Sequence, residues 1–296
     1  MKTLLIPFVA LASLGAAPAP KPALAPSEIV AAAPASDWIA IAPADMLVMT
    51  LASGKQAVIQ LMPPPFSQGW IGNIRKLAAA RWWDGLSINR VQDNYVVQWG
   101  DASEKKVLPE GLISVGEGDY ETMPLPGVLN FVHSINVPDA YAAQTMIWRG
   151  WPLSSKGRVA PIHCYGMVGV GRNLSPDTGS GAELYTVIGH APRHLDRNIA
   201  VVGRVISGIE NLSSLPRGTG ALGFYEKAEE RVGITSIRLA SELPAVNQPR
   251  FEYLSTDSKS FAAYADARAN RRDAFFNVPA GGADICNIPV PVRKKP

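Results

Sequence analysis

An arginine and a glutamine eight positions apart are the residues of this chain best placed to do chemistry together. Arg90 and Gln98 flank the turn-forming segment 92–94, and the residues between them alternate with apolar ones. This pattern is typical of a hairpin or a bulged strand, which can aim both side chains at one surface. Such a pair on a half-exposed strand is usually only solvated, so its meaning depends on the surrounding residues.

Those surrounding residues resemble the signature of the cyclophilin family. In that signature, Tyr-Asp-Gly is followed by Phe-His-Arg-Val and then by Gly-Phe-Met-x-Gln-Gly-Gly-Asp. Tyr95 stands here for the aromatic residue and Val96 for the methionine. The residues that match in register are Asp84, Gly85, Arg90, Val91, Gln98, Gly100 and Asp101.

A second block, between Cys164 and Gly218, resembles the later part of the cyclophilin core. It contains CYGMVGVGRN and then SGAELYTVIGHAPRHLDRNIAVVGRVISGIENLSSLPRG. The resemblance covers roughly residues 45–239 and is weakest at 102–161.

The resemblance implies a mainly β protein with helices, built on a closed antiparallel β-barrel that helices cap. Residues 102–161 are expected to be an insertion in this domain, with an elaborated loop favoured over a lid or partner surface. Residues 240–296 are expected to be a C-terminal extension packed on the barrel.

The resemblance also implies an activity, peptidyl-prolyl cis-trans isomerisation. The barrier to rotation about a peptide bond is about 18–20 kcal/mol, because the amide has partial double-bond character. A catalyst needs an apolar pocket for the proline ring and a donor near the prolyl nitrogen, whose lone pair becomes available in the twisted state. Arg90 is the expected donor, and Gln98 is expected to orient it or to bind substrate backbone.

Further substrate-binding residues follow from the same match. The apolar floor is expected to consist of Tyr95, Val96, Met167, Tyr185 and Leu195, with His194 at the rim. Taken singly, Val96, Met167 and Leu195 are as readily explained by core packing. The expected substrates are proline-containing polypeptides, and no cofactor or metal is expected.

Several positions depart from the family pattern. Val168-Gly169 replaces an Ala-Asn pair that clamps substrate backbone, and Ile199 replaces a histidine. Glu183 replaces a glutamine, and its carboxylate is expected to approach Arg90 and divert its hydrogen bonds. These changes favour an alternative function, a catalytically weak cyclophilin-like binding module or chaperone of the cell envelope.

The two cysteines of the chain are Cys164 and Cys286. In an oxidising compartment such a pair most often forms a disulfide, which would fasten the proline-rich end of the chain to the core. Free buried thiols are the alternative. A thiol enzyme or a zinc site using His163, His190 or His194 is less well supported, because the spacing matches no tetrahedral motif.

The N-terminal residues have the layout of a secretory signal. Lys2 precedes an apolar run from Leu4 to Ala12, and small residues follow. Residues 1–25 are therefore expected to be a signal peptide and 26–44 an Ala/Pro-rich leader, and the Ala- and Pro-rich residues 17–35 are expected to stay extended or disordered. We therefore expect the protein to be secreted, and more specifically to be located in the periplasm. No later stretch is long and apolar enough for a membrane helix.

The composition is that of an ordinary globular protein. Of its 296 residues, 47% are hydrophobic and 18% charged, enough to bury a core. The formal charge of +3 includes lysines at both ends, so the folded body is close to neutral. No basic stripe indicates nucleic-acid binding, and the protein is expected to act as a monomer.

Local patterns predict the elements that position these residues. Strands are expected at 46–51, 57–61, 184–188, 200–205 and 234–239, and helices at 67–80 and 207–215. Residues 139–146 are expected to form one short helix. Another helix is expected after a cap at Thr256 or Asp257, with the face of Phe261, Tyr264, Ala265 and Arg268 against the barrel.

Overall fold

The computed structural model of the chain describes residues 23–123, 133–134 and 139–295. The expected signal segment falls almost entirely outside these residues. Four helices are described: α1 (Pro26–Ala32), α2 (Gln68–Ala79), α3 (Glu210–Ser213) and α4 (Lys259–Ala269). Short 3₁₀ turns connect many elements, among them η3 (Glu117–Tyr120), η5 (Arg193–Leu195), η6 (Ala221–Gly223) and η10 (Ile285–Asn287).

Eight antiparallel strands close into a barrel, in the order β10-β11-β5-β4-β13-β2-β3-β12. The barrel strands are β2 (Met46–Leu51), β3 (Gln56–Leu61), β4 (Ser87–Val91), β5 (Val96–Gly100), β10 (Met167–Val170), β11 (Leu184–Val187), β12 (Val201–Ser207) and β13 (Val232–Leu239). The expected fold class is therefore confirmed. The barrel closes because the late strands β12 and β13 pair with the early strands β3 and β2. No strand of the closed barrel therefore has an unpaired edge.

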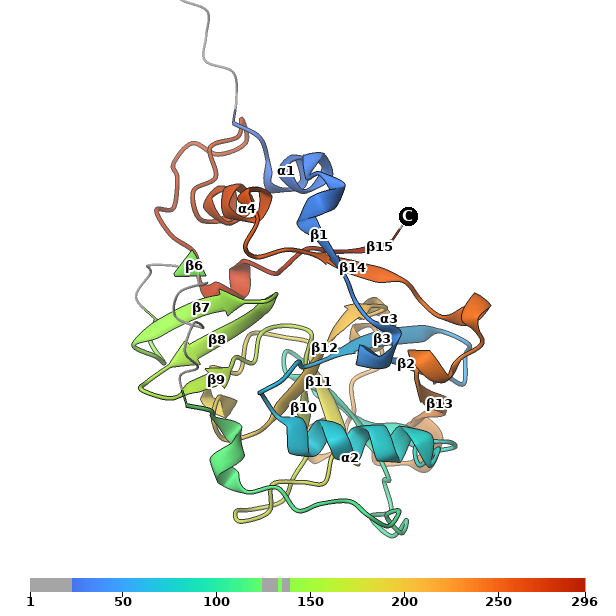
Figure 1. The fold of residues 1–296 in the computed structure, drawn as a ribbon. Helices are drawn as coiled ribbons and strands as arrows, with labels where there is room; N and C mark the ends of the chain where they lie inside the picture. Colours follow the sequence, from blue (N-terminus) through green and yellow to red (C-terminus); the bar gives the residue numbers. More distant parts are fainter. Residues whose placement is uncertain (1–22, 124–132, 135–138, 296) are drawn as a thin grey trace, which may run out of the picture.

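Helix α2 lies below the barrel strands in the view of Figure 1. Its sequence places Trp70, Ile74 and Leu77 on one face, and all three are buried in the main hydrophobic core. Trp70 also stacks on Tyr120 of η3, with ring centroids 5.4 Å apart. The predicted helix at 67–80 is confirmed, with observed bounds of Gln68–Ala79.

The insertion is more ordered than the sequence suggested. It contains a four-stranded antiparallel sheet made of β6 (His133–Ser134), β7 (Gln144–Trp148), β8 (Trp151–Ser155) and β9 (Val159–Pro161). The expected helix at 139–146 is wrong, because β7 begins at Gln144 and Asp139 accepts hydrogen bonds from the N–H groups of Tyr141 and Ala142. A carboxylate that bonds to its own following backbone favours a turn over a helix interior.

The two ends of the chain come together in a third sheet. It consists of β1 (Trp38–Ala40), β14 (Phe251–Leu254) and β15 (Val292–Lys294), with β14 in the centre. Phe251 of β14 shares a hydrophobic cluster with Met46 and Val48 of the barrel strand β2. This sheet is thus the part of the extension that packs on the barrel.

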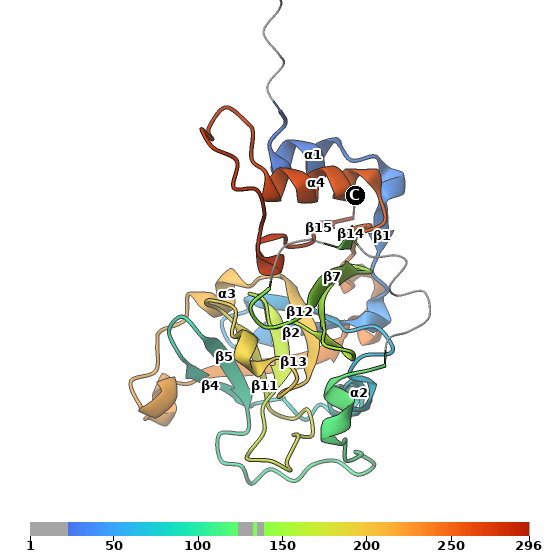
Figure 2. The ribbon, with the colours of Figure 1, turned by 90° about the vertical axis from the view of Figure 1, so that its left-hand side faces the viewer.

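Above this sheet, α1 and α4 lie side by side (Figures 1 and 2). The N-terminal leader was expected to stay extended, and for Pro26–Ala32 this is wrong, since α4 offers that short helix a packing partner. The expected cap of α4 is also wrong by one or two residues. Ser258 caps it, its hydroxyl accepting from the N–H of Phe261 at 3.0 Å. Phe261 and Tyr264 are buried and belong to the main hydrophobic core cluster, which also contains barrel residues, and helix α4 packs against α1.

The predicted disulfide between Cys164 and Cys286 is present in the structure, with Cα atoms 5.1 Å apart. Cys164 lies three residues before β10 begins, and Cys286 lies in η10. The bond therefore joins the barrel to the C-terminal segment across 122 positions of sequence.

Candidate active site

Arg90 and Gln98 are direct cross-strand partners on β4 and β5. The ladder is irregular between Ile88 and Arg90, so the strand is bulged, as the sequence allowed. Arg90 Nη1 donates a hydrogen bond of 3.2 Å to Gln98 Oε1. The structure thus brings the two expected catalytic residues together with their functional groups in contact.

Two further acceptors hold the guanidinium, one from the turn after β4 and one from the loop at η6, which the sequence did not single out. Arg90 Nε donates to the carbonyl oxygen of Leu222 at 2.7 Å, and Nη2 donates to Gln92 Oε1. The carbon of the guanidinium lies 5.3 Å from the ring centroid of Phe224 and 5.6 Å from that of Tyr95, within the range of cation–π attraction. Burial lowers the pKa of Arg90. No sequence signal could have revealed a backbone carbonyl from residue 222, since that contact depends on the path of the loop.

Beside Arg90 lies a small apolar cluster that corresponds to the expected pocket floor. Val96, Tyr185 and Val187 form its buried centre, and Tyr95, Leu195 and Ile199 pack against them. Four of the expected floor residues are therefore gathered here, together with Val187 and Ile199, which were not assigned to it. Met167 and Val168 belong instead to the main hydrophobic core cluster.

Tyr185 adds a polar group to this floor. Its hydroxyl lies 2.9 Å from His163 Nε2, and His163 Nδ1 lies 3.0 Å from Asp196 Oδ1. Since a carboxylate only accepts, Nδ1 carries the proton and Nε2 is free to accept from the tyrosine hydroxyl. Burial raises the pKa of Tyr185 well above its ordinary value. His163 therefore anchors a pocket residue rather than serving a thiol or a metal.

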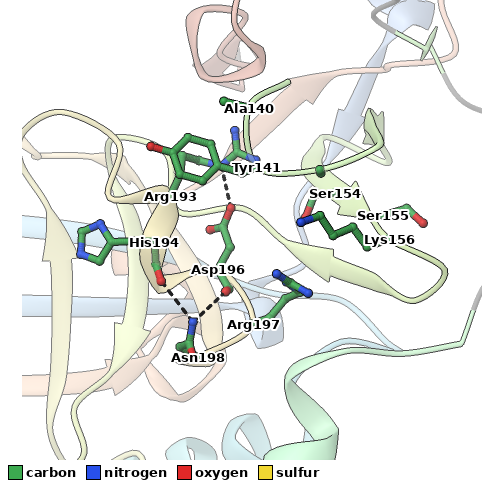
Figure 3. Close-up of a pocket in the computed structure, with 11 residues that line it drawn as sticks. Ala140, Tyr141, Ser154, Ser155, Lys156, Arg193, His194, Asp196, Arg197 and Asn198 are labelled. Carbon is green, nitrogen blue, oxygen red and sulfur yellow. Dashed lines mark hydrogen bonds and ion pairs between the residues drawn. The ribbon is translucent and has the colours of Figure 1, made fainter. Parts of the chain in front are cut away.

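Asp196 is held in turn by a buried arginine. Arg193 Nε donates to Asp196 Oδ2 at 2.6 Å, and its Nη1 donates to Asp139 Oδ2 at 2.7 Å. Figure 3 shows Arg193, Asp196 and His194 around a neighbouring cavity of about 190 Å³. His194 stacks on Tyr95, with ring centroids 6.3 Å apart, so the structure places it at the edge of the pocket floor.

Glu183 approaches Gln98 rather than Arg90. The carboxylate accepts hydrogen bonds from the side chains of Gln98 and Asn89 and from the N–H of Asp101, while burial raises its pKa to about 7. It forms no ion pair with Arg90, whose partners are those named above. The expectation that Glu183 pairs with Arg90 is therefore wrong. The glutamine amide lies between the two charges and bonds to both.

Gly169 leaves room for Tyr185. A Cβ atom at position 169 would lie 2.3 Å from the tyrosine hydroxyl oxygen, far inside van der Waals contact. The side chain that the family carries at this position would not fit beside Tyr185 as it is placed here. Substrate contacts at Gly169 are thus limited to its backbone.

A cavity of about 520 Å³ continues from this site past Gln98 and Glu183. Phe224 and Arg172 also line it. The cavity therefore extends from Gln98 and Glu183 to Phe224, on the loop that contacts Arg90. A volume of this size lies within the range of ligand-binding pockets in proteins.

Within residues 23–123, 133–134 and 139–295, no three His, Cys, Asp or Glu side chains gather in a way that could hold a metal ion. Both cysteines are consumed by the disulfide. Among the helices that the structure describes, none combines the length and apolar character needed to cross a bilayer.

The family model "Cyclophilin type peptidyl-prolyl cis-trans isomerase/CLD" matches residues 70–239. The chain belongs to this family, whose members bind proline-containing peptides. The match covers all the expected catalytic and substrate-binding residues, from Arg90 to Leu195. No curated protein sequence matches the chain.

Solved structures with the same fold include the cyclophilin AquaCyp293 from Hirschia baltica. It is 21% identical, the alignment covers 86% of this chain and 92% of that one, and the TM-score is 0.66. A cyclophilin type peptidyl-prolyl cis-trans isomerase from Cryptosporidium parvum, solved in the presence of the dipeptide Ala-Pro, is 11% identical. That alignment covers 66% of this chain and 98% of the other, with a TM-score of 0.40.

Proposed function

We propose that this protein isomerises peptidyl-prolyl bonds and that Arg90 assists rotation by donating toward the prolyl nitrogen. The observation that carries the proposal is the contact between Arg90 and Gln98, 3.2 Å apart, beside the apolar cluster of Val96, Tyr185 and Val187. The proline ring would lie on that cluster. This arrangement supplies the two things the reaction needs, a dry surface for the ring and a fixed charged donor next to it.

The donor acts on the twisted state more than on either ground state. In the planar amide the nitrogen lone pair is delocalised, and it becomes a hydrogen-bond acceptor only as rotation breaks the conjugation. A guanidinium that is already positioned therefore stabilises the transition state selectively. Gln98 positions it through Oε1, while its amide N–H groups donate to Glu183.

A direct test is an isomerisation assay on the purified chain with a proline-containing peptide. The cis-to-trans relaxation of such a peptide takes tens to hundreds of seconds unaided. Acceleration that scales with protein concentration, and that excess unlabelled proline peptide suppresses, supports the proposal. Relaxation at the uncatalysed rate at every protein concentration would exclude it.

We further propose that the substrates are exported proteins and that the protein works in the periplasm. The apolar N-terminal run after Lys2 and the disulfide between Cys164 and Cys286 support this address, because disulfides persist in oxidising compartments. Fractionation of cells expressing the full chain, with the N-terminus of the recovered protein sequenced, tests it. Uncleaved protein in the cytosolic fraction would contradict it.

A second candidate function is a binding module with little catalysis. It is favoured by the state of Arg90, whose Nε, Nη1 and Nη2 all donate within the protein. A substrate would have to share or displace these contacts. Peptide binding by calorimetry together with no acceleration in the relaxation assay would identify this function.

A further inference from the structure

The loop at 218–226 lies along β4, beside the arginine that the proposed mechanism requires. The N–H of Tyr225 donates to the carbonyl oxygen of Asn89 at 3.0 Å, and Phe224 is paired with Arg90 in an isolated antiparallel bridge. Because these contacts involve backbone atoms, they hold position 224 beside Arg90 whichever side chain it carries.

The tip of this loop is fixed in an unusual backbone conformation. Leu222 has a φ of 56°, in the left-handed region, and its carbonyl oxygen accepts a hydrogen bond from Arg90 Nε at 2.7 Å. Gly223 follows with a φ of 80°, and a Cβ atom there would lie 2.6 Å from the Cα atom of Gln92. Backbone conformations of this kind cost free energy and cluster at functional sites. The loop tip is therefore a tightly packed part of the site.

Phe224 lies between the guanidinium and the cavity of about 520 Å³ that begins at Gln98. Its ring centroid is 5.3 Å from the guanidinium carbon of Arg90, and the residue also lines the cavity. Of this large apolar residue, 38% is exposed. An aromatic residue held in place at a cavity wall offers apolar surface that a bound peptide can cover.

The composition of the cavity wall favours an apolar side chain over a charged one. Trp82, Leu108 and Tyr225 line the cavity together with Phe224. Charged residues of both signs line it as well, namely Asp101, Glu104, Asp177, Glu183, Lys106, Arg172 and Arg231. A charge brought into the cavity would therefore meet repulsion as well as attraction, whereas an apolar side chain gains by covering exposed apolar surface.

The residue before the proline is the part of a substrate best placed to reach this wall. In the proposed mechanism the proline ring lies on the apolar cluster and the prolyl nitrogen lies near Arg90. The acyl group on that nitrogen belongs to the preceding residue, so its side chain branches closer to the nitrogen than that of the following residue. Gln98 bonds to Arg90 and lines the cavity, so the cavity begins where this side chain would leave the reacting bond.

We propose that Phe224 sets the substrate preference of the isomerase site by contacting the side chain before the proline, and that it favours a large apolar or aromatic residue there. The proposal rests on the proposed isomerase function. Phe224 acts on the choice of substrate, whereas Arg90 acts on the bond that rotates.

The test compares kcat/KM for peptides that differ only in the residue before the proline, which is Phe, Leu, Ala, Glu or Lys. The unmodified chain should isomerise the Phe and Leu peptides most efficiently. Phe224→Ala should reduce the ratio of kcat/KM for the Phe peptide to that for the Ala peptide by about twofold to tenfold, the range that an aromatic contact contributes. The ratio is the readout because a disturbance of Arg90 would lower all the rates together.

Two further variants control for this effect. Phe224→Tyr should keep the preference, and so should Phe275→Ala, which removes an aromatic ring that is 82% exposed and lies outside the cavity. Acceleration of every peptide with an unchanged ratio in Phe224→Ala would overturn the proposal and leave the isomerase function intact. Should the unmodified chain accelerate no peptide, the isomerase function is excluded, and calorimetric affinities for the same peptides decide the contact. Affinities that do not change between the unmodified chain and Phe224→Ala would overturn it.

Discussion

The hydroxyl of Tyr185 occupies the space that a side chain at Gly169 would need. A Cβ atom on Gly169 would lie 2.3 Å from that oxygen and 2.4 Å from the ring carbon that bears it. The ring does not move aside freely, because His163 Nε2 bonds to the hydroxyl at 2.9 Å. A side chain at position 169 and the hydroxyl of Tyr185 as placed here are thus mutually exclusive in the pocket.

Gly169→Ala should therefore destabilise the protein by about 1–3 kcal/mol, the usual cost of overpacking a well-filled site. Denaturant unfolding followed by circular dichroism measures the change. Gly118→Ala is the matched control, because a Cβ there meets nothing within 4 Å. Equal stability of the two variants would contradict the account.

The same relationship predicts non-additivity. Tyr185→Phe removes the hydrogen bond to His163, which frees the ring to shift away from position 169. The double variant with Gly169→Ala should lose less stability than the sum of the two single losses, by an interaction energy of about 0.5–3 kcal/mol. Strict additivity would show that the two positions do not compete for space.

Glu183 should make both stability and activity depend on pH near neutrality. Its pKa is raised from 4.5 to about 7 by burial. Between these values the unfolded state has already released the proton that the folded state retains, so stability falls as pH rises through this window and levels off above it. Glu183→Gln should remove this fall and flatten the pH profile of kcat/KM.

Denaturant unfolding and isomerisation rates at a series of pH values from 4 to 9 test this. Glu104→Gln is the control, since this exposed carboxylate lines the same cavity and should leave both profiles as they are. A Glu183→Gln variant that keeps the original slope would rule out Glu183 as the group that titrates. Loss of activity in a folded Glu183→Gln variant would instead assign the carboxylate a positive role through Gln98.

The disulfide should contribute a large share of the stability of the extension. It closes a loop of 122 residues, and cross-links of this span stabilise by about 2–5 kcal/mol. Cys286→Ser should lower the free energy of unfolding by that amount. Dithiothreitol should lower the free energy of unfolding of the unmodified chain by a similar amount and leave that of the variant unchanged. A further decrease in the variant would contradict this account, because the reductant would then act on something other than the disulfide.

The resemblance to the cyclophilin family implied the barrel and the pair of Arg90 and Gln98, and local signals in the sequence supported both. Alternation and turn residues define the hairpin that aligns Arg90 with Gln98, and helical spacing defines α2. The cysteine pairing followed from there being two cysteines. These features depend on neighbouring residues or on composition, which a single sequence displays directly.

What the sequence missed depends on long-range packing. The loop carbonyl of Leu222 reaches Arg90 across 132 positions, and the register of β11 against β5 pairs Tyr185 with Gln98, leaving Glu183 beside Gln98 and away from Arg90. The helical expectation at 139–146 failed because the pattern there is equally compatible with a strand, and the sheet partners of β7 decided it.

Arg90 is the residue on which the proposed mechanism depends most. Arg90→Ala should lower kcat/KM by about a hundredfold to a thousandfold, since loss of one positioned transition-state donor costs about 2.7–4 kcal/mol. Its hydrogen bond to Leu222 and its contact with Phe224 also tie the loop to β4, so a stability loss of about 1 kcal/mol should accompany the change. Arg90→Lys should be impaired as well, because an ammonium cannot reproduce the planar fork that bonds to Gln98 and Leu222 at once.

The measurement compares rates of proline-peptide relaxation after circular dichroism has shown that the variants are folded. Arg75→Ala, which removes a surface arginine paired with Asp45, is the control and should keep full activity. Full activity in folded Arg90→Ala would transfer the catalytic role to the apolar floor and remove the guanidinium from the mechanism.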